Sequence, residues 1–152
     1  MTPIEPGQLQ GIHVLLVEDN EDALYILESY FRHHGAMVTT AANGRDALAI
    51  LRQITPHVIV SDITMPEMTG LELIREVRAL PGQRERPTPA IAVTAYPYHH
   101  QRKEALEAGF DAFLVKPIDP LVVVSYVRAL YEQTGPDGRV GEVRLTGSQD
   151  SR

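Results

Sequence analysis

The sequence contains no cysteine among its 152 residues. This absence excludes disulfide bonds, thiolate catalysis and a cysteine-ligated zinc site. Basic residues are scarce too, because 14 lysines and arginines stand against 20 aspartates and glutamates and leave a formal net charge of −6. That balance argues against direct DNA binding, which needs a basic surface.

Long apolar runs are also missing. No stretch approaches the ~18–20 apolar residues of a membrane-spanning helix. The first residues, MTPIEPGQLQG, have neither the basic start nor the apolar run of a secretion signal. The sequence therefore predicts a cytoplasmic protein with no membrane contact. Its hydrophobic fraction of 43% is sufficient for the core of one domain.

Apolar segments alternate with segments of helical periodicity along most of the chain. The expected strands are residues 12–17, 36–43, 57–62, 90–95 and 111–116, and the expected helices are residues 21–34, 44–54, 70–80, 99–109 and 119–132. The strands are apolar throughout, as in parallel sheets buried on both faces. The pattern predicts an α/β fold with a doubly wound, five-stranded parallel sheet.

Both ends of the chain have a different composition. Residues 1–10 hold two prolines and a glycine, and residues 134–152 are polar and rich in glycine. Such segments bury little apolar surface. We therefore expect one domain over residues 11–133, flanked by a flexible N-terminal segment and a flexible C-terminal tail.

Polar residues stand at the ends of four expected strands, at the sheet edge where ligands bind in doubly wound folds. They are Glu18 and Asp19, then Asp62, Thr94 and Lys116. Each has a plain structural explanation on its own: Asp19 could cap the first helix, Thr94 suits a strand, and Lys116 could be solvated. Their coincidence at one edge favours a functional site.

This set of side chains suits phosphoryl chemistry. Clustered carboxylates repel one another unless a cation lies among them, and a ligand set made only of oxygen favours Mg²⁺ or Mn²⁺. An aspartate can form an aspartyl-phosphate, while a lysine and a hydroxyl stabilise the transferring group. The cluster is equipped to accept a phosphoryl group on a carboxylate, and no glycine-rich cradle for a nucleotide is evident.

Four segments, VLLVEDN, VIVSDITMPEMTGLELI, IAVTA and AFLVKPID, carry these residues in order. Over residues 11–132 they resemble the receiver domain of two-component response regulators, in particular the chemotaxis-type single-domain receivers. The resemblance implies a flavodoxin-like (βα)5 sandwich. It also implies that the chain accepts phosphate from a sensor histidine kinase or a histidine phosphotransfer protein and passes the signal to a downstream protein.

The resemblance assigns a role to each residue of the site. Asp62 would be the phospho-acceptor, and Glu18, Asp19 and the backbone carbonyl of Thr64 would join it around Mg²⁺. Thr94 and Lys116 would contact the phosphoryl group. The Lys116–Pro117 peptide bond is expected to be cis. Phe113 would be the switch aromatic, turning inward after Thr94 and reshaping the surface of the fourth helix, fifth strand and fifth helix.

Some positions depart from the family pattern. Glu18 replaces an aspartate in the acidic pair, and Thr69 stands before Gly70 where aspartate is usual. Thr64 and Tyr96 flank the expected route of water to an acyl phosphate, and neither is a strong base or an amide. We therefore expect slow self-dephosphorylation; the alternative is that Tyr96 only shields the loop.

The last expected helix offers a possible contact surface. Val123, Val127, Leu130 and Tyr131 should pack on the sheet, which leaves Val122, Tyr126 and Ala129 on a neighbouring face. Val122 and Tyr126 have i, i+4 spacing. They favour a partner or homodimer contact, although scattered apolar surface residues are an equally simple explanation.

The function expected from the sequence is a stand-alone signalling switch that turns over no external substrate. Three alternatives stay open. The chain could be the excised receiver of a hybrid histidine kinase, or a phosphatase that forms an aspartyl-phosphate, since DIT loosely resembles a D-x-T signature. It could also be a receiver-like binding module that never takes phosphate.

Overall fold

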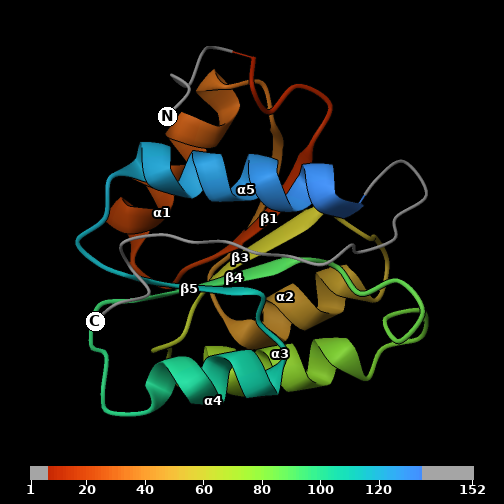
Figure 1. The fold of residues 1–152 in the computed structure, drawn as a ribbon, viewed down its shortest axis with the longest axis vertical. Coiled ribbons are helices and arrows are strands. Elements are labelled where there is room, and N and C mark those ends of the chain that lie inside the picture. The colour runs from red at the N-terminus through yellow and green to blue at the C-terminus, as the bar shows by residue number, and fades with distance from the viewer. Residues whose placement is uncertain (1–6, 135–152) are drawn as a thin grey trace.

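The computed structural model describes residues 7–134, in which five strands alternate with five helices (Figure 1). Their bounds are β1 His13–Val17, α1 Glu21–His33, β2 Met37–Ala41, α2 Gly44–Leu51, β3 Val58–Asp62, α3 Gly70–Arg78, β4 Ala90–Thr94, α4 Gln101–Ala108, β5 Ala112–Val115 and α5 Pro120–Thr134. All strand pairs are parallel, in the order β2-β1-β3-β4-β5. The doubly wound, flavodoxin-like fold expected from the sequence is confirmed.

Two layers of helices cover the sheet. Helices α1 and α5 pack on one face, and α2, α3 and α4 cover the other (Figure 1). Successive strand residues alternate between two core clusters: Val14 and Leu16 join the cluster under α1 and α5, while Leu15 and Val17 join the cluster under α2 to α4. This alternation explains why the strands are apolar at every position.

The strand order reverses between β1 and β3. The chain passes from β1 to β2 at one edge and then returns to β3 on the other side of β1. The carboxyl ends of neighbouring strands at such a switch point are the usual ligand-binding place in this fold. Here they carry Glu18, Asp19 and Asp62.

Side-chain caps begin the first three helices. The Asn20 side chain accepts from the N–H of Ala23 at 2.9 Å and caps α1. Helix α3 has a capping box, in which Thr69 accepts from the N–H of Glu72 and the Glu72 carboxylate accepts from the N–H of Thr69. The possibility that Asp19 caps α1 is therefore wrong, because Asn20 does so.

The N-terminal part of the domain begins earlier than expected. Leu9 is fully buried in the core cluster under α1 and α5, and its N–H donates to the carbonyl of His34 at 2.8 Å. The expectation of a flexible segment over residues 1–10 did not foresee this packing. Thr134 belongs to α5. The rest of both flexible-segment expectations, residues 1–6 and 135–152, lies outside the described residues.

Candidate functional site

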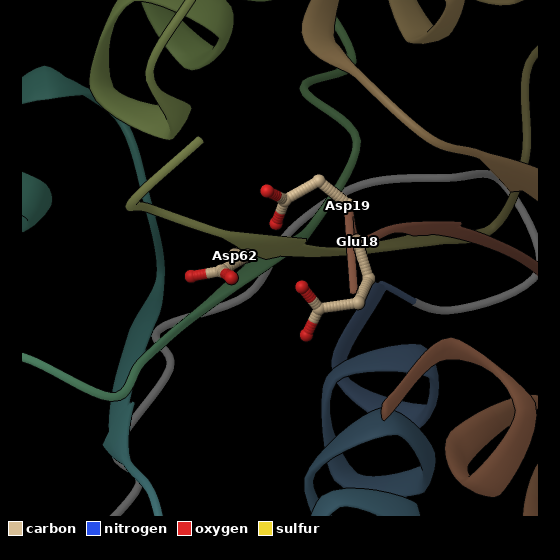
Figure 2. Close-up of side chains that lie close together, drawn as sticks. All are labelled: Glu18, Asp19 and Asp62. Atoms are coloured by element: carbon tan, nitrogen blue, oxygen red, sulfur yellow. The ribbon is translucent and has the colours of Figure 1, made fainter. Parts of the chain in front are cut away.

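Three carboxylates meet at the switch point of the sheet. Each of Glu18, Asp19 and Asp62 offers an oxygen, and these oxygens all lie within 4.8 Å of one another. Figure 2 shows the three side chains turned toward a common space. Glu18 and Asp62 are buried and Asp19 is exposed, so the cluster has a buried floor and one carboxylate facing solvent.

Strand register accounts for this meeting. Strands β1 and β3 pair with Val17 opposite Ser61, so the next residues, Glu18 and Asp62, emerge side by side. The N–H of Glu18 still donates to Ala41 on β2 at 3.1 Å. Asp19 then lies one residue before the Asn20 cap, which leaves its carboxylate available to the site.

Lys116 supplies the positive charge of the site from the end of β5. Its Nζ lies 2.5 Å from Glu18 Oε1 and 3.7 Å from Asp62 Oδ2. The N–H of Lys116 donates to the carbonyl of Thr94 at 2.8 Å, and the Lys116–Pro117 peptide bond is cis. An ammonium in this place can bind an anionic group carried on Asp62.

The carboxylates titrate differently from ordinary acids. Burial, together with hydrogen bonding and repulsion from Glu18, raises the pKa of Asp62 to about 7. Burial alone would also raise the pKa of Glu18, but its interactions with Asp62 and Lys116 lower it. Without a cation the pair therefore tends to hold one proton on Asp62.

A divalent cation fits this ligand set. All three side chains of the cluster are carboxylates. Their oxygen atoms are the hard ligands that Mg²⁺ and Mn²⁺ prefer. The cleft around it has a volume of about 520 Å³ and also includes Thr64 and Lys116. A cation placed among these acids would favour their charged forms.

Thr64 and Tyr96 line the cleft of the acceptor, and Thr94 contacts Tyr96. Thr94 is completely buried, and its hydroxyl accepts from the N–H of Tyr96 at 3.3 Å. The N–H of Thr64 donates to Asp62 Oδ1 at 3.1 Å. Thr64 and Tyr96 both line the cleft, and the Tyr96 side chain is 75% exposed. Both residues therefore lie in the cleft that holds Asp62, and their effect on the approach of water stays a prediction.

Phe113 is buried in the cluster under α2 to α4. It also borders a pocket of about 550 Å³ beside Tyr98, His99 and Lys116. The predicted pair Val122 and Tyr126 and the nearby Ala129 are half-buried on α5, whereas Val123, Val127 and Leu130 are buried as expected. Tyr126 also packs against the core under α1 and α5.

From the sequence, Gly70 is expected only to belong to the turn that leads from Asp62 into α3. A Cβ at this position would lie 2.4 Å from the carbonyl oxygen of Asp62, so only glycine lets α3 begin so close to the acceptor. The turn before α3 also holds Glu67 at a φ of 67°, an unusual backbone conformation for a residue other than glycine. A glycine can be recognised in a sequence, but the backbone it approaches cannot.

Residues 14–128 match the model of the response regulator receiver domain. Because this match covers most of the chain, the protein belongs to the response regulator receiver domain family. Among the described residues, no helix is both long and apolar enough to cross a membrane.

Two relatives show how the match is distributed. The chain is 40% identical over 129 residues to an uncharacterized 14.6 kDa protein of Leptolyngbya boryana, covering 85% of this chain and 97% of that one. It is 35% identical over 113 residues to the Regulator of RpoS of Escherichia coli, which covers 74% of this chain but 32% of the relative. The second relative is therefore matched over about a third of its length.

Two solved structures have the same fold. The receiver domain of the sensor histidine kinase PA1611 from Pseudomonas aeruginosa, with magnesium in its active-site cleft, aligns with a TM-score of 0.73 and 30% identity, covering 80% of this chain and 98% of that one. The receiver domain of Ssk1 from Saccharomyces cerevisiae, in complex with the histidine phosphotransfer protein Ypd1, aligns with a TM-score of 0.70 and 28% identity, covering 78% and 87%.

Proposed function

We propose that the protein is a phospho-accepting signalling switch, in which Asp62 takes a phosphoryl group from a phosphohistidine donor. The observation that carries this proposal is the convergence of three carboxylates within 4.8 Å with a lysine ammonium 3.7 Å from Asp62. The chain acts on itself and turns over no external substrate.

The transfer would be an in-line displacement at phosphorus. An Asp62 carboxylate oxygen attacks the phosphorus in line with the phosphorus–nitrogen bond of the donor. That bond breaks, and its electron pair returns to the imidazole nitrogen of the donor. Lys116, whose Nζ is already beside Asp62, would bind the charged phosphoryl oxygens, and the hydroxyl of Thr94 would donate to another oxygen.

Magnesium, or manganese in its place, would neutralise charge on the transferring group. Glu18, Asp19 and Asp62 would hold it, with the backbone carbonyl of Thr64 as a further ligand. The all-oxygen cluster supports this assignment, and so does the likeness to a receiver domain that contains magnesium. Asp62 must be deprotonated to attack, and a cation lowers its raised pKa.

The phosphohistidine donor would dock on α1 beside the site. A groove of about 440 Å³ adjoins the carboxylate cleft and is lined by Ala23, Ile26, Leu27, Val93, Ala95, Lys116, Pro117, Ile118 and Pro120. Ile26 is 50% exposed although it is strongly apolar. A receiver of this family binds a histidine phosphotransfer protein, and we propose a similar protein or a sensor histidine kinase here.

The output would come from the surface of α4, β5 and α5. Phosphorylation would draw Thr94 toward the phosphoryl group, and Phe113 would turn into the space that it leaves. A downstream protein would read this change, and Val122, Tyr126 and Ala129 would form a partner or homodimer contact on α5. We propose a cytoplasmic protein that acts through protein contacts and not on DNA.

Thr64 and Tyr96 would set the lifetime of the phosphorylated state. Both line the cleft around Asp62, and neither offers a carboxylate or amide to orient a water molecule. Slow self-dephosphorylation is therefore the expected behaviour.

Intact mass spectrometry tests the proposal directly. After incubation with acetyl phosphate and Mg²⁺, the wild type should gain about 80 Da, the mass of one phosphoryl group. Asp62→Asn should gain nothing under the same conditions. A wild type without the added mass would overturn the proposal.

Donor docking needs a separate test. Ile26→Glu should slow transfer from a phosphorylated histidine phosphotransfer protein but leave labelling by acetyl phosphate unchanged, because the small donor needs no docking groove. Tyr25→Glu, at the neighbouring exposed position outside the groove, is the matched control. Equal slowing with both donors would show that Ile26 affects the site and not docking.

We prefer the hypothesis that the protein is a stand-alone regulator, because a 14.6 kDa relative is matched over 97% of its length. The receiver of a hybrid kinase is the second candidate, since a similar solved receiver comes from a sensor histidine kinase. The phosphatase alternative has less support. A phosphatase with a D-x-T signature would have its nucleophile on the first strand, whereas Asp62 ends β3 and the first strand is followed by Glu18 and Asp19. A phosphatase would hydrolyse a chromogenic phosphate ester, whereas a signalling switch would not.

A further inference from the structure

Arg78, the last residue of α3, contacts both the loop that follows its own helix and the segment that links α4 to β5. Its Nε and Nη2 donate to the carbonyl of Gly109 at 3.0 and 2.6 Å. Its Nη1 donates to the Gln83 side chain at 2.9 Å and to the carbonyl of Thr88 at 2.7 Å. Nη2 also lies 3.4 Å from Asp111 Oδ2. All five guanidinium N–H groups are thereby used.

These contacts hold the C-terminal end of α4. Gly109 is the residue that ends α4, at a φ of 132°, and a Cβ there would meet Arg78 Cγ at 2.8 Å. Asp111 accepts from the N–H of Ala90 at 2.8 Å, and its own N–H donates back to the carbonyl of Ala90. Because Ala90 begins β4, the guanidinium connects the end of α4 to the starts of β4 and β5.

The other end of α4 is attached at the surface, where the hydroxyl of Tyr98 donates to Glu104 Oε2 at 2.8 Å. Its N-cap residue His100 has a left-handed backbone at a φ of 70° and makes no side-chain cap hydrogen bond. Gln101 is 2% exposed, and its Oε1 has no hydrogen-bond partner among the described residues. The pocket of about 550 Å³ lies beneath this end, between residues 97–102 and Phe113.

We infer that Arg78 is a positioning residue for the switch: it fixes the C-terminal end of α4 to β4 and β5, so that phosphorylation displaces this helix only at its N-terminal end. The inference rests on the proposed function. A helix that is held at one end by a half-buried guanidinium with all its N–H groups bonded, and that lacks a side-chain cap at the other end, responds unequally along its length. Movement at Thr94 and Phe113 would then tilt α4 about Gly109.

Hydrogen exchange of the full chain measures this directly. We compare the wild type with and without Mg²⁺ and beryllofluoride, a stable stand-in for the phosphoryl group on Asp62. Exchange in residues 95–104 should change by roughly tenfold or more, whereas residues 105–111 should stay nearly constant. An equal change along the whole helix overturns the inference, and this result needs no variant.

Variants then assign the effect to Arg78. In Arg78→Met the response to beryllofluoride should spread into residues 105–111, and Arg78→Lys, which keeps the charge but not the planar fork, should restore it only in part. The control is Arg52→Met, at an exposed arginine that directly follows α2 on the same face of the sheet. If Arg78→Met only lowers thermal stability and keeps the wild-type exchange pattern, its role is merely structural and the inference is wrong.

The two proposals fail in different ways. No mass gain from acetyl phosphate and no exchange response to beryllofluoride would refute the proposed function. A normal mass gain with a uniform response along α4 would refute only the positioning role of Arg78.

Discussion

Gly70→Ala should destabilise the protein through a contact that involves the phospho-acceptor itself. Gly70 is the first residue of α3, and its N–H donates to the carbonyl of Ile63 at 2.8 Å. A methyl group here would lie 2.4 Å from the Asp62 carbonyl oxygen and 2.7 Å from Ile63 Cα. These are backbone atoms, so no side-chain rotation relieves the overlap. The loop that carries Asp62 must move.

The size of the effect follows from two opposing contributions. Overpacking in a tight site costs about 1–3 kcal/mol, and immovable backbone places this site at the upper end. Alanine is favoured over glycine in a helix by up to about 1 kcal/mol. We therefore expect the free energy of unfolding to fall by about 2 kcal/mol. With a urea m-value of about 2 kcal/mol/M, the midpoint falls by about 1 M.

Gly44→Ala is a matched control for this experiment. Gly44 is likewise buried and is the first residue of α2, after the Asn43 cap. Its added methyl would meet Sδ, Cγ and Cβ of Met68 at 2.8, 2.9 and 3.0 Å; these are side-chain atoms, and rotation of the methionine moves Sδ and Cγ away. Urea titration followed by circular dichroism should show a change within about 1 kcal/mol. If Gly44→Ala is the more damaging of the two, or if Gly70→Ala matches the wild type, the reasoning is refuted.

Four further outcomes are expected. In the metal-free protein Asp62 has a pKa of about 7, well above its value of about 3.9 in the unfolded chain. As the pH rises the unfolded state releases this proton first, so the free energy of unfolding falls between about pH 4 and 7 by at most about 4 kcal/mol. Asp62→Asn should remove that fall in urea titrations at the two pH values. Mg²⁺ at a hundredfold excess over its dissociation constant should stabilise the wild type by about 2.7 kcal/mol, and thermal unfolding should show most of this lost in Asp19→Asn. Tyr96→Glu should shorten the lifetime of the phosphorylated state in a mass time course; an unchanged or longer lifetime would contradict the role of Tyr96. Val122→Glu combined with Tyr126→Ala should weaken self-association in sedimentation, and an unchanged molecular mass would retire the α5 contact.

The sheet and the centre of the site could be predicted because both depend on local patterns. Apolar runs give buried strands, and the carboxyl ends of parallel strands share one edge. Glu18, Asp19 and Asp62 therefore had to converge once the strand order was that of a doubly wound fold. Spacing alone does not give the distance of 3.7 Å between Lys116 and Asp62, because the rotamer of a long side chain depends on its surroundings.

The remaining features depend on contacts between distant residues. The polar composition of residues 81–89 predicts an exposed loop, yet Gln83 and Thr88 are buried. Arg78 at the end of α3 donates hydrogen bonds to both residues. Leu9 stands in a segment rich in proline and glycine, and only its packing in the core cluster under α1 and α5 explains its burial. No short-range pattern encodes such pairings.

The alternation of strand residues between the two core clusters has a consequence for how the molecule can diversify. Leu27, beneath the proposed docking groove, belongs to one cluster, whereas Phe113 belongs to the other, on the opposite face of the sheet. Substitutions at separated sites without shared neighbours add within about 0.5 kcal/mol. A lineage could therefore change the residues under the proposed docking groove without retuning the aromatic that responds to the phosphoryl group, and substitutions at Leu27 and Phe113 should have additive effects on the free energy of unfolding.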